Sequence, residues 1–285
     1  KRSLLYRHNT TTIVRISSKG KYYGAKQVEL ALQKIVLSQY DYVTEGTPWH
    51  YHENPYFMFV LSGNMLDCNK KGQSLLPAGS LMFNNWQEQH YGSRHSPAAS
   101  GFHLEFERSW FKKHDFDLDI LEGSQKIDDP HVQFLVSKVY FEFLLADEYS
   151  ELSTDLLLLQ ICDALRIKKE GVKSSVPSWV TQLKELLHDD SSDITLQGLS
   201  KEIGVHPVHI SRAAPKYLSV SLGEYIRKIK LSKATSALLD STMSLTEIAY
   251  HAGFSDQSHF NHVFKTYYQV NPGSFRKRVK QSARG

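Results

Sequence analysis

The chain has few cysteines, little net charge and no long apolar run. Its 285 residues include only Cys68 and Cys162, too few for the disulfide framework of a small secreted protein. No apolar stretch approaches the ~20 residues that a membrane-spanning helix needs. Residues 1–21 also lack the apolar centre of a signal peptide. We therefore expect a cytoplasmic protein that does not enter a membrane.

The net charge of +4 is spread unevenly along the chain. Residues 177–285 hold 14 Lys and Arg against 9 Asp and Glu, whereas residues 1–176 hold 20 against 21. A basic surplus confined to one part of a chain is typical of a nucleic-acid-binding domain. The densest basic run, Arg276–Lys280, is either a phosphate contact or a solvated end.

The segment Ser244–Phe275 has the pattern of two short helices joined by a glycine-containing turn. Apolar residues at helical spacing around Ile248 predict the first helix, Gly253 ends it, and Ser255 or Asp256 can cap the second. This is the pattern of a helix-turn-helix, whose second helix enters the DNA major groove. The DNA-contacting face of that helix is expected to comprise Gln257, Ser258, Asn261, His262 and Lys265.

A second copy of the pattern, Thr195–Tyr217, lies about 50 residues earlier. Its expected DNA contacts are Val208, Ser211 and Arg212, of which the arginine fork can bind guanine O6 and N7 together. Ser221–Leu239 between the copies suits one long helix, which would hold both reading helices over adjacent major grooves. The alternative is an ordinary helical domain with polar faces.

Taken together, these segments resemble a known family. The run GFSDQSHFNHVFKTYYQVNPGSFRK, with the first copy and GEYIRKIKLSKATSALL, is similar to the DNA-binding domain of AraC/XylS transcription regulators over Pro177–Lys280. The resemblance implies seven helices, two helix-turn-helix motifs, double-stranded promoter DNA as a partner, and an activator that contacts RNA polymerase. Pro215 departs from the pattern, because an interior proline is expected to bend or end the first reading helix near Ala214.

The first half of the chain reads as a small β-barrel followed by two helices. Short β-branched and aromatic runs alternate with turn residues, as in a barrel or jelly roll. The fold class expected is two-domain α+β: an N-terminal cupin-like β-barrel with two helices, then an all-α domain with two helix-turn-helix motifs. The boundaries expected are 1–170 for the sensor and dimerisation domain, 171–178 for a linker, and 179–285 for the DNA-binding domain.

Three histidines, His50, His52 and His90, fall where metal-binding cupins place their histidine ligands, by resemblance. Tyr56 stands where those proteins have a glutamate. Three imidazoles could still bind Zn²⁺ with an open coordination position, or they could contact a ligand without any metal. Because the carboxylate is missing, we expect no metal and no other cofactor.

A small-molecule pocket inside the barrel is the favoured use of these side chains. Aromatic faces with convergent polar groups suit a sugar-like or aromatic effector, although barrel core is the alternative for any one residue. The expected lining is Trp49, His50, His52, Tyr56, Trp86, His90 and His103.

Residues 130–170 read as two helices, His131–Leu145 and Ser150–Lys169. Four consecutive leucines, 156–159, point in all directions around the second helix, so more than one side of it must be covered. A homodimer interface is expected to use Leu152, Leu156 and Leu159; a helix buried within one chain is the alternative.

These observations together predict a ligand-responsive transcription regulator that is not an enzyme and has no catalytic residues. It would activate metabolic genes in response to a sugar-like molecule. Two alternatives remain open: a cupin metalloenzyme fused to a DNA-binding domain, and a constitutive DNA-binding dimer without an effector.

Overall fold

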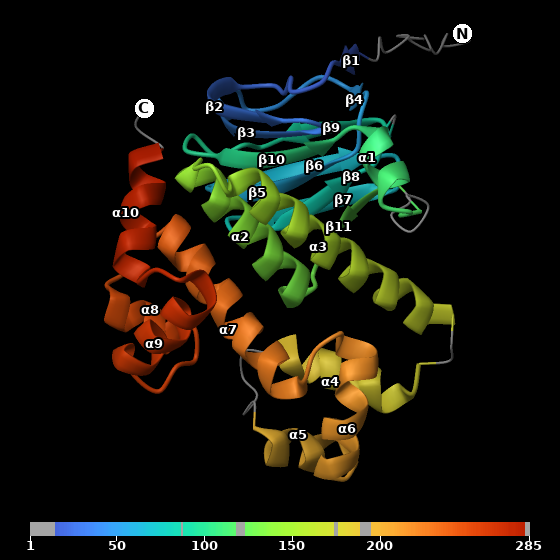
Figure 1. Cartoon of the computed structure of the whole chain (residues 1–285), viewed down its shortest axis with the longest axis vertical. Coiled ribbons are helices and arrows are strands. Elements are labelled where there is room, and N and C mark those ends of the chain that lie inside the picture. The colour runs from blue at the N-terminus through green and yellow to red at the C-terminus, as the bar shows by residue number, and fades with distance from the viewer. Residues whose placement is uncertain (1–14, 87, 118–122, 174–175, 189–194, 283–285) are drawn as a thin grey trace, which may run out of the picture.

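The protein consists of a β-rich N-terminal part and a helical C-terminal part, as expected (Figure 1). The computed structural model describes residues 15–86, 88–117, 123–173, 176–188 and 195–282. Helices α2 (Pro130–Leu145) and α3 (Ser150–Lys173) lie below the sheets in this view, and α7 (Leu222–Leu239) runs between two groups of helices, α4–α6 and α8–α10 (Figure 1). Among the described residues, no helix combines the length and apolar character needed to cross a membrane.

Two sheets face each other in the N-terminal part. The larger has the strand order β11 (Ser124–Lys126), β8 (Leu81–Asn84), β5 (Tyr56–Ser62), β10 (Ser100–Phe106), β3 (Ile35–Asp41) and β2 (Ala25–Leu32). The smaller has the order β1 (Arg15–Ser17), β4 (His50–His52), β9 (His90–Ser93), β6 (Asn64–Asn69) and β7 (Gly72–Pro77). Neighbouring strands are antiparallel, except β1 and β4, which pair in parallel.

The central strands of the larger sheet are buried on both faces, which is why they read as continuous apolar runs. One face, including Phe57, Phe83 and Leu104, packs against helices. The opposite face, with Tyr56 and Met58, lines the space between the two sheets. The barrel interior is therefore closed off from the helices by a layer of aromatic side chains.

Within the described residues, the N-terminal part has three helices: α1 (Arg108–Lys113) before β11, and α2 (Pro130–Leu145) and α3 (Ser150–Lys173) after it. The two long ones confirm the sequence-based prediction, whereas α1 was not predicted. Asp129 caps α2 by accepting from two backbone N–H groups, and Pro130 occupies the first turn, where its missing donor costs nothing. Helix α3 continues to Lys173, so the linker expected over 171–178 begins inside the helix; residues 174–175 lie outside the described part.

Seven helices form the described C-terminal part, in agreement with the family pattern. They are α4 (Ser178–His188), α5 (Leu196–Ile203), α6 (Pro207–Leu218), α7 (Leu222–Leu239), α8 (Leu245–His251), α9 (Gln257–Tyr268) and α10 (Pro272–Ser282). The expected end of the first reading helix near Ala214 is wrong, because α6 continues through Pro215 to Leu218. Pro215 and Ser211 are both exposed, so water can bind the Ser211 carbonyl that the proline leaves without its helical donor.

A single hydrophobic cluster crosses the expected domain boundary. It joins the helix-facing side of the larger sheet, α2 and α3 to the second half of α7 and to α8–α10. Phe141 of α2 stacks on Phe275 of α10, with ring centroids 5.4 Å apart. The first helix-turn-helix unit, α4–α6 with the first half of α7, has a separate core. The second unit thus shares a hydrophobic core with the N-terminal part, whereas the first unit does not.

Polar contacts also join the two parts. Tyr268 of α9 reaches Ser137 of α2 at 2.6 Å and Thr235 of α7 at 3.0 Å. Farther along α7, the Ser236 hydroxyl donates to the Ala78 carbonyl at 2.6 Å, and the Gly63 N–H donates to Asp240 at 2.8 Å. These contacts connect two turns of the barrel directly to the helix that carries both helix-turn-helix units.

Candidate DNA-contacting helices and a histidine-lined cavity

Helix α9 presents the expected polar outer face. Asp256 caps it by accepting from the His259 N–H at 2.8 Å, and the apolar side of the helix is buried. Ser258, His262 and Lys265 are exposed, whereas Gln257 and Asn261 are half-buried. Gln257 accepts a hydrogen bond from Thr246 of α8, which fixes the two helices of this motif relative to each other.

Helix α6 presents a comparable face. Ser211 and Arg212 are exposed, and the apolar side chain of Val208 is 49% exposed. An apolar group left in water at this place can meet a thymine methyl in the major groove. His209 on α6 and His259 on α9 are also exposed, and neither was predicted as a DNA contact. Each directly follows a predicted contact in the sequence, and this position could have indicated them.

Helix α7 joins the two motifs without interruption over Leu222–Leu239. Ser221 caps its first turn by accepting from the Glu224 N–H. Both helix-turn-helix units pack against α7, so their separation is set by a rigid element rather than a loop. This arrangement confirms the predicted long connecting helix.

A small cavity lies between the two sheets. Its volume is about 40 Å³, and its lining includes five of the seven predicted effector contacts: His50, His52, Tyr56, His90 and His103. Trp49 and Trp86 do not line it: Trp49 packs on Tyr91, and Trp86 lies under the Arg108 guanidinium. The predicted lining is therefore wrong for these two side chains, whereas effector binding by the other five stays a prediction.

The sequence reasoning missed the residues that complete the lining. They are Tyr22, Tyr23, Tyr42, Thr47, Met58, Met65, Asp67, Gly92 and His95. Alternation along β5 gave a usable signal for Met58, since it lies two residues from Tyr56. No local signal marks Tyr22, because its place depends on the path of the loop before β2.

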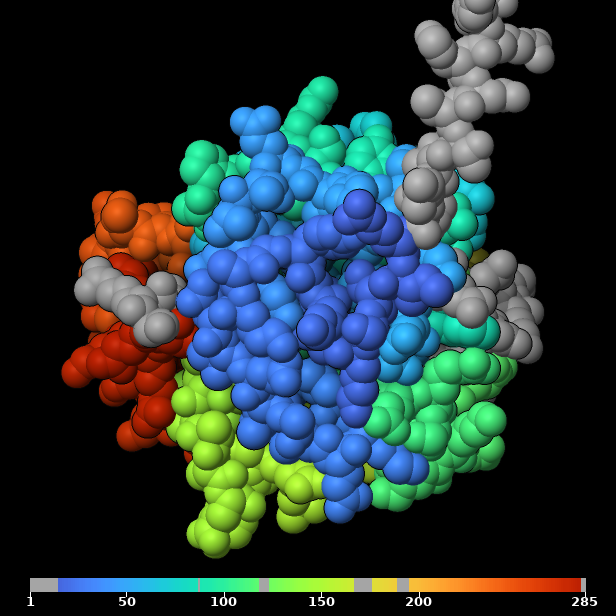
Figure 2. Space-filling model, turned by 90° about the horizontal axis from the view of Figure 1, so that it is seen from above, coloured from blue at the N-terminus to red at the C-terminus, as the bar shows by residue number. Residues whose placement is uncertain are grey.

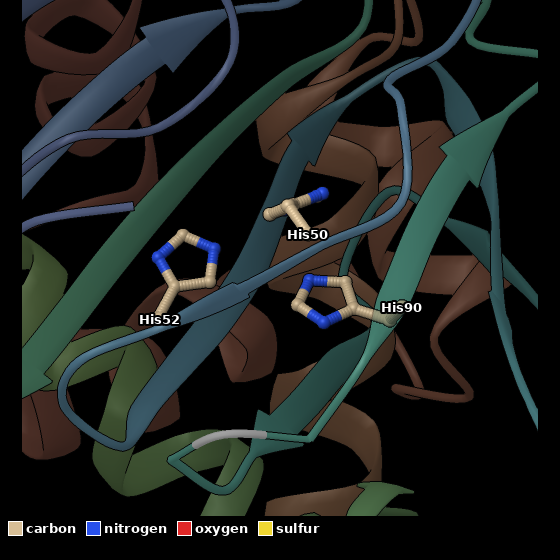
Figure 3. A group of neighbouring side chains, drawn as sticks. All are labelled: His50, His52 and His90. Atoms are coloured by element: carbon tan, nitrogen blue, oxygen red, sulfur yellow. The ribbon is translucent and has the colours of Figure 1, made fainter. Parts of the chain in front are cut away.

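Three buried histidines converge at one end of the cavity (Figure 3). His50 and His52 lie two residues apart on β4, and His90 of β9 pairs directly with His50. Their ligand nitrogens lie within 4.8 Å of one another. The Nδ1 atoms of His50 and His90 lie 2.8 and 3.1 Å from the carbonyls of Pro48 and Glu88. Those contacts place the ring proton on Nδ1 and leave each Nε2 as an acceptor, and at His90 this acceptor faces the Tyr56 hydroxyl at 3.1 Å.

The electrostatics of the cavity favour neutral side chains. Burial lowers the pKa of His50 to about 3 and that of His90 to about 4, and it also lowers the pKa of His52. Burial raises the pKa of the Asp67 carboxyl to about 7. Near neutral pH the histidines are therefore uncharged imidazoles with available lone pairs.

The histidine cluster fits a divalent transition-metal ion by its donor chemistry. Neutral imidazoles are common ligands of zinc and its neighbours, and ligating histidines usually hold a backbone carbonyl or carboxylate through their second nitrogen. Both ring nitrogens of His52 are buried and lack a hydrogen-bond partner within the described part of the chain. His50, His52 and His90 would hold the ion, and Tyr56, whose hydroxyl lies 3.1 Å from His90 Nε2, stands beside it.

The three leucines expected at a dimer interface differ in exposure. Leu152 and Leu156 of α3 are 64% and 52% exposed, and Tyr149 beside them is 64% exposed. Leu157 and Leu158 are buried, and Leu159 is half-buried against the same core. An apolar strip of α3 therefore faces solvent in the single chain.

Comparisons with known proteins place the C-terminal part in a family. A family model described as a helix-turn-helix domain matches residues 199–278. The chain is 30% identical over 109 residues to the probable transcription factor PqrA of Proteus vulgaris, covering 38% of this chain and 85% of that protein. It is 26% identical over 114 residues to the Msm operon regulatory protein of Streptococcus mutans, covering 40% of this chain and 41% of that protein.

Two further matches cover more of the chain at lower identity. The chain is 25% identical over 132 residues to the transcriptional activator RhaS of Escherichia coli, covering 45% of this chain and 47% of that one. Among solved structures, ToxT from Vibrio cholerae aligns with 87% of this chain and 99% of its own, with 15% identity and a TM-score of 0.35. The matches to the Msm and RhaS proteins thus span less than half of those proteins' length. With two helix-turn-helix units on one connecting helix, the chain belongs to the AraC/XylS family of DNA-binding transcription regulators.

Proposed function

We propose that the chain is a ligand-responsive regulator that binds double-stranded promoter DNA in a sequence-specific way, in the cytoplasm. The observation that carries this proposal is the pair of exposed polar faces on α6 and α9, held on one helix that also contacts the barrel. Similarity to the activator RhaS supports an activating role, in which the DNA-bound protein would contact RNA polymerase.

The contacts between α7 and the barrel give the effector a route to DNA. A small molecule that binds inside the barrel and shifts the turns at Gly63 and Ala78 would move their hydrogen-bond partners Asp240 and Ser236. Because a ligand changes an equilibrium only through a difference in affinity, the effector must bind the DNA-competent arrangement better or worse than the other.

The test is selection of binding sites from random double-stranded DNA by the full chain. A recovered motif with two sub-sites about one helical turn apart would support the proposal, because α7 holds two reading helices. Binding without any sequence preference at moderate salt would contradict it, since phosphate contacts alone give that result.

We also propose that two copies associate through the exposed strip on α3. The strip contains Leu152 and Leu156, and burying each leucine stabilises an interface by about 1.5–3 kcal/mol. Leu75 of β7 is 63% exposed on the barrel and offers a matched control. Sedimentation should show a weaker dimer for Leu152→Glu with Leu156→Glu and no change for Leu75→Glu.

A metal-responsive barrel is the second candidate, supported by the unpartnered nitrogens of His52 among three converging imidazoles. A bound ion would supply a fixed positive charge in the cavity. Titration of the metal-free full chain with Zn²⁺ should show one saturable site in the wild type. His90→Ala should lose that site, whereas His114→Ala, outside the cavity, should keep it; equal binding by both variants would contradict this candidate.

A further inference from the structure

Tyr22 lines the cavity between the two sheets. It lies in the loop between β1 and β2. Figure 2 looks onto the face of the molecule that the first strands, in blue, cover. Its ring stacks on His103 with centroids 3.7 Å apart and lies 4.9 Å from the His52 ring. The edges of Tyr40 and Tyr56 complete the surroundings, at 5.4 and 5.1 Å. Tyr22 thus occupies an aromatic slot built by residues of other strands.

A carboxylate closes the polar end of this slot. The Tyr22 hydroxyl donates to Glu105 Oε2 at 3.0 Å, and the Gly20 N–H donates to the same oxygen at 2.7 Å. The other oxygen of Glu105 accepts from Asn54 at 2.9 Å. Glu105 is only 2% exposed, so the slot offers a buried acceptor to whatever group lies in the place of the phenol.

The cavity beside Tyr22 is too small for an effector. At about 40 Å³ it has room for a few water molecules. Pockets for organic ligands usually measure roughly 300–1,000 Å³. A molecule as large as a sugar therefore cannot enter unless a side chain leaves. Tyr22 is a lining residue that a loop carries, so it can leave without breaking the pairing of a strand.

Two glycines with positive φ flank Tyr22 in this loop. Gly20 has φ +68° and Gly24 has φ +134°. A Cβ on Gly24 would lie 2.5 Å from the Asp41 carbonyl, so only glycine fits this turn. Outside the slot, the Tyr40 hydroxyl donates to the Gly20 carbonyl. The start of the loop is also held at the surface, where the Lys19 N–H donates to Glu53 and the Lys19 ammonium pairs with Glu107.

We propose that the barrel binds a planar aromatic compound with a hydroxyl or amino donor, which takes the place of the Tyr22 phenol. This inference rests on the ligand-responsive function proposed above and names the chemical class of the effector. The spacing of 3.7 Å to His103 suits a flat ring better than a puckered sugar. The buried Glu105 selects a donor and repels a benzoate-like carboxylate.

The first experiment uses the full chain with Tyr22→Ala and 4-methylphenol, which is the tyrosine side chain as a free molecule. We expect saturable binding and a rise in melting temperature with this probe. Toluene should bind about tenfold more weakly or worse, because it lacks the donor to a charged acceptor. Tyr91→Ala, which truncates a tyrosine outside the cavity, is the matched control and should respond no more strongly than the wild type. Equal responses of the two variants would overturn the slot.

The second experiment compares ligands on the wild type and does not depend on any variant folding. 4-Methylphenol and 4-methylaniline should stabilise the chain, more weakly than they stabilise Tyr22→Ala, since the tyrosine must leave first. Benzoate and glucose should not. Stabilisation by glucose alone would overturn the proposed class. If the wild type shows no sequence-specific DNA binding in the separate selection experiment, the regulator function is contradicted but the aromatic slot is not.

Discussion

Replacing Tyr268 with phenylalanine tests whether the DNA-binding part is packed against the N-terminal part as described. The Tyr268 ring is buried among α2, α7 and α9, and its hydroxyl lies within hydrogen-bond distance of Ser137 and Thr235. Ser137 itself donates to the Phe134 carbonyl at 2.7 Å, so it accepts from Tyr268. Tyr268→Phe removes the middle group of this hydroxyl chain and leaves the ring in place.

The expected cost follows from the two hydrogen bonds. Each neutral bond contributes about 0.5–1.5 kcal/mol, and Thr235 is left buried without this partner, so the free energy of unfolding should fall by about 2 kcal/mol. For a chain of this size that corresponds to a drop of roughly 4 °C in melting temperature. Thermal unfolding followed by circular dichroism measures it.

Tyr250→Phe is the control, because Tyr250 is 62% exposed and its hydroxyl is free to meet water. Its melting temperature should stay close to that of the wild type, since exposed substitutions usually change stability by less than ~0.5 kcal/mol. If Tyr268→Phe has the same melting temperature as Tyr250→Phe and the wild type, the Tyr268 hydroxyl meets solvent and the shared core is refuted.

Three further predictions concern DNA contact, association and pH. Arg212→Ala should weaken binding to the selected DNA site by about 1–3 kcal/mol and relax preference at one or two base pairs, whereas Lys201→Ala on α5 should not; an equal loss on all sequences would make Arg212 a phosphate contact. Leu152→Glu with Leu156→Glu should lower the fraction of dimer without lowering the melting temperature; a dimer as stable as that of the wild type would place the interface elsewhere. Burial and the neighbouring Lys228 lower the pKa of His131 from its usual value near 6.5. The unfolded chain therefore binds this proton more readily, so the folded state loses stability as the pH falls below about 6.5. Denaturant unfolding at pH 7 and 5.5 should show a smaller loss for His131→Gln; an unchanged loss would assign the acid sensitivity to other groups.

Local signals in the sequence identified the helix-turn-helix units. Asp256 caps α9, and the capping pair Ser244 and Glu247 starts α8, as short-range hydrogen bonds dictate wherever the chain lies in the fold. Apolar spacing gave α7 and α2 for the same reason. Pro215 misled this reasoning, because a helix held by buried Ala214 and Leu218 outlasts the loss of one hydrogen bond at an exposed site.

Strand pairing decided what the cavity contains. His50 and His52 share a face of β4 by alternation alone, but His90 joins them only because β9 pairs with β4 in a register that sets it opposite His50. Trp49 and Trp86 have the right chemistry for a ligand pocket, yet neither side chain lines the cavity.

The sequence by itself determined that this chain carries two DNA-reading motifs on one helix after a β-rich part, because caps, turn glycines and apolar spacing act over a few residues. Only the tertiary structure decided that the second motif shares a core with the N-terminal part and that Tyr22 lines the cavity between the sheets. Both depend on which surfaces meet across more than 80 residues of chain, as Tyr22 meets Glu105 and Ser137 meets Tyr268. Periodicity shows that a face is apolar, but the partner of that face is chosen by packing of the whole chain.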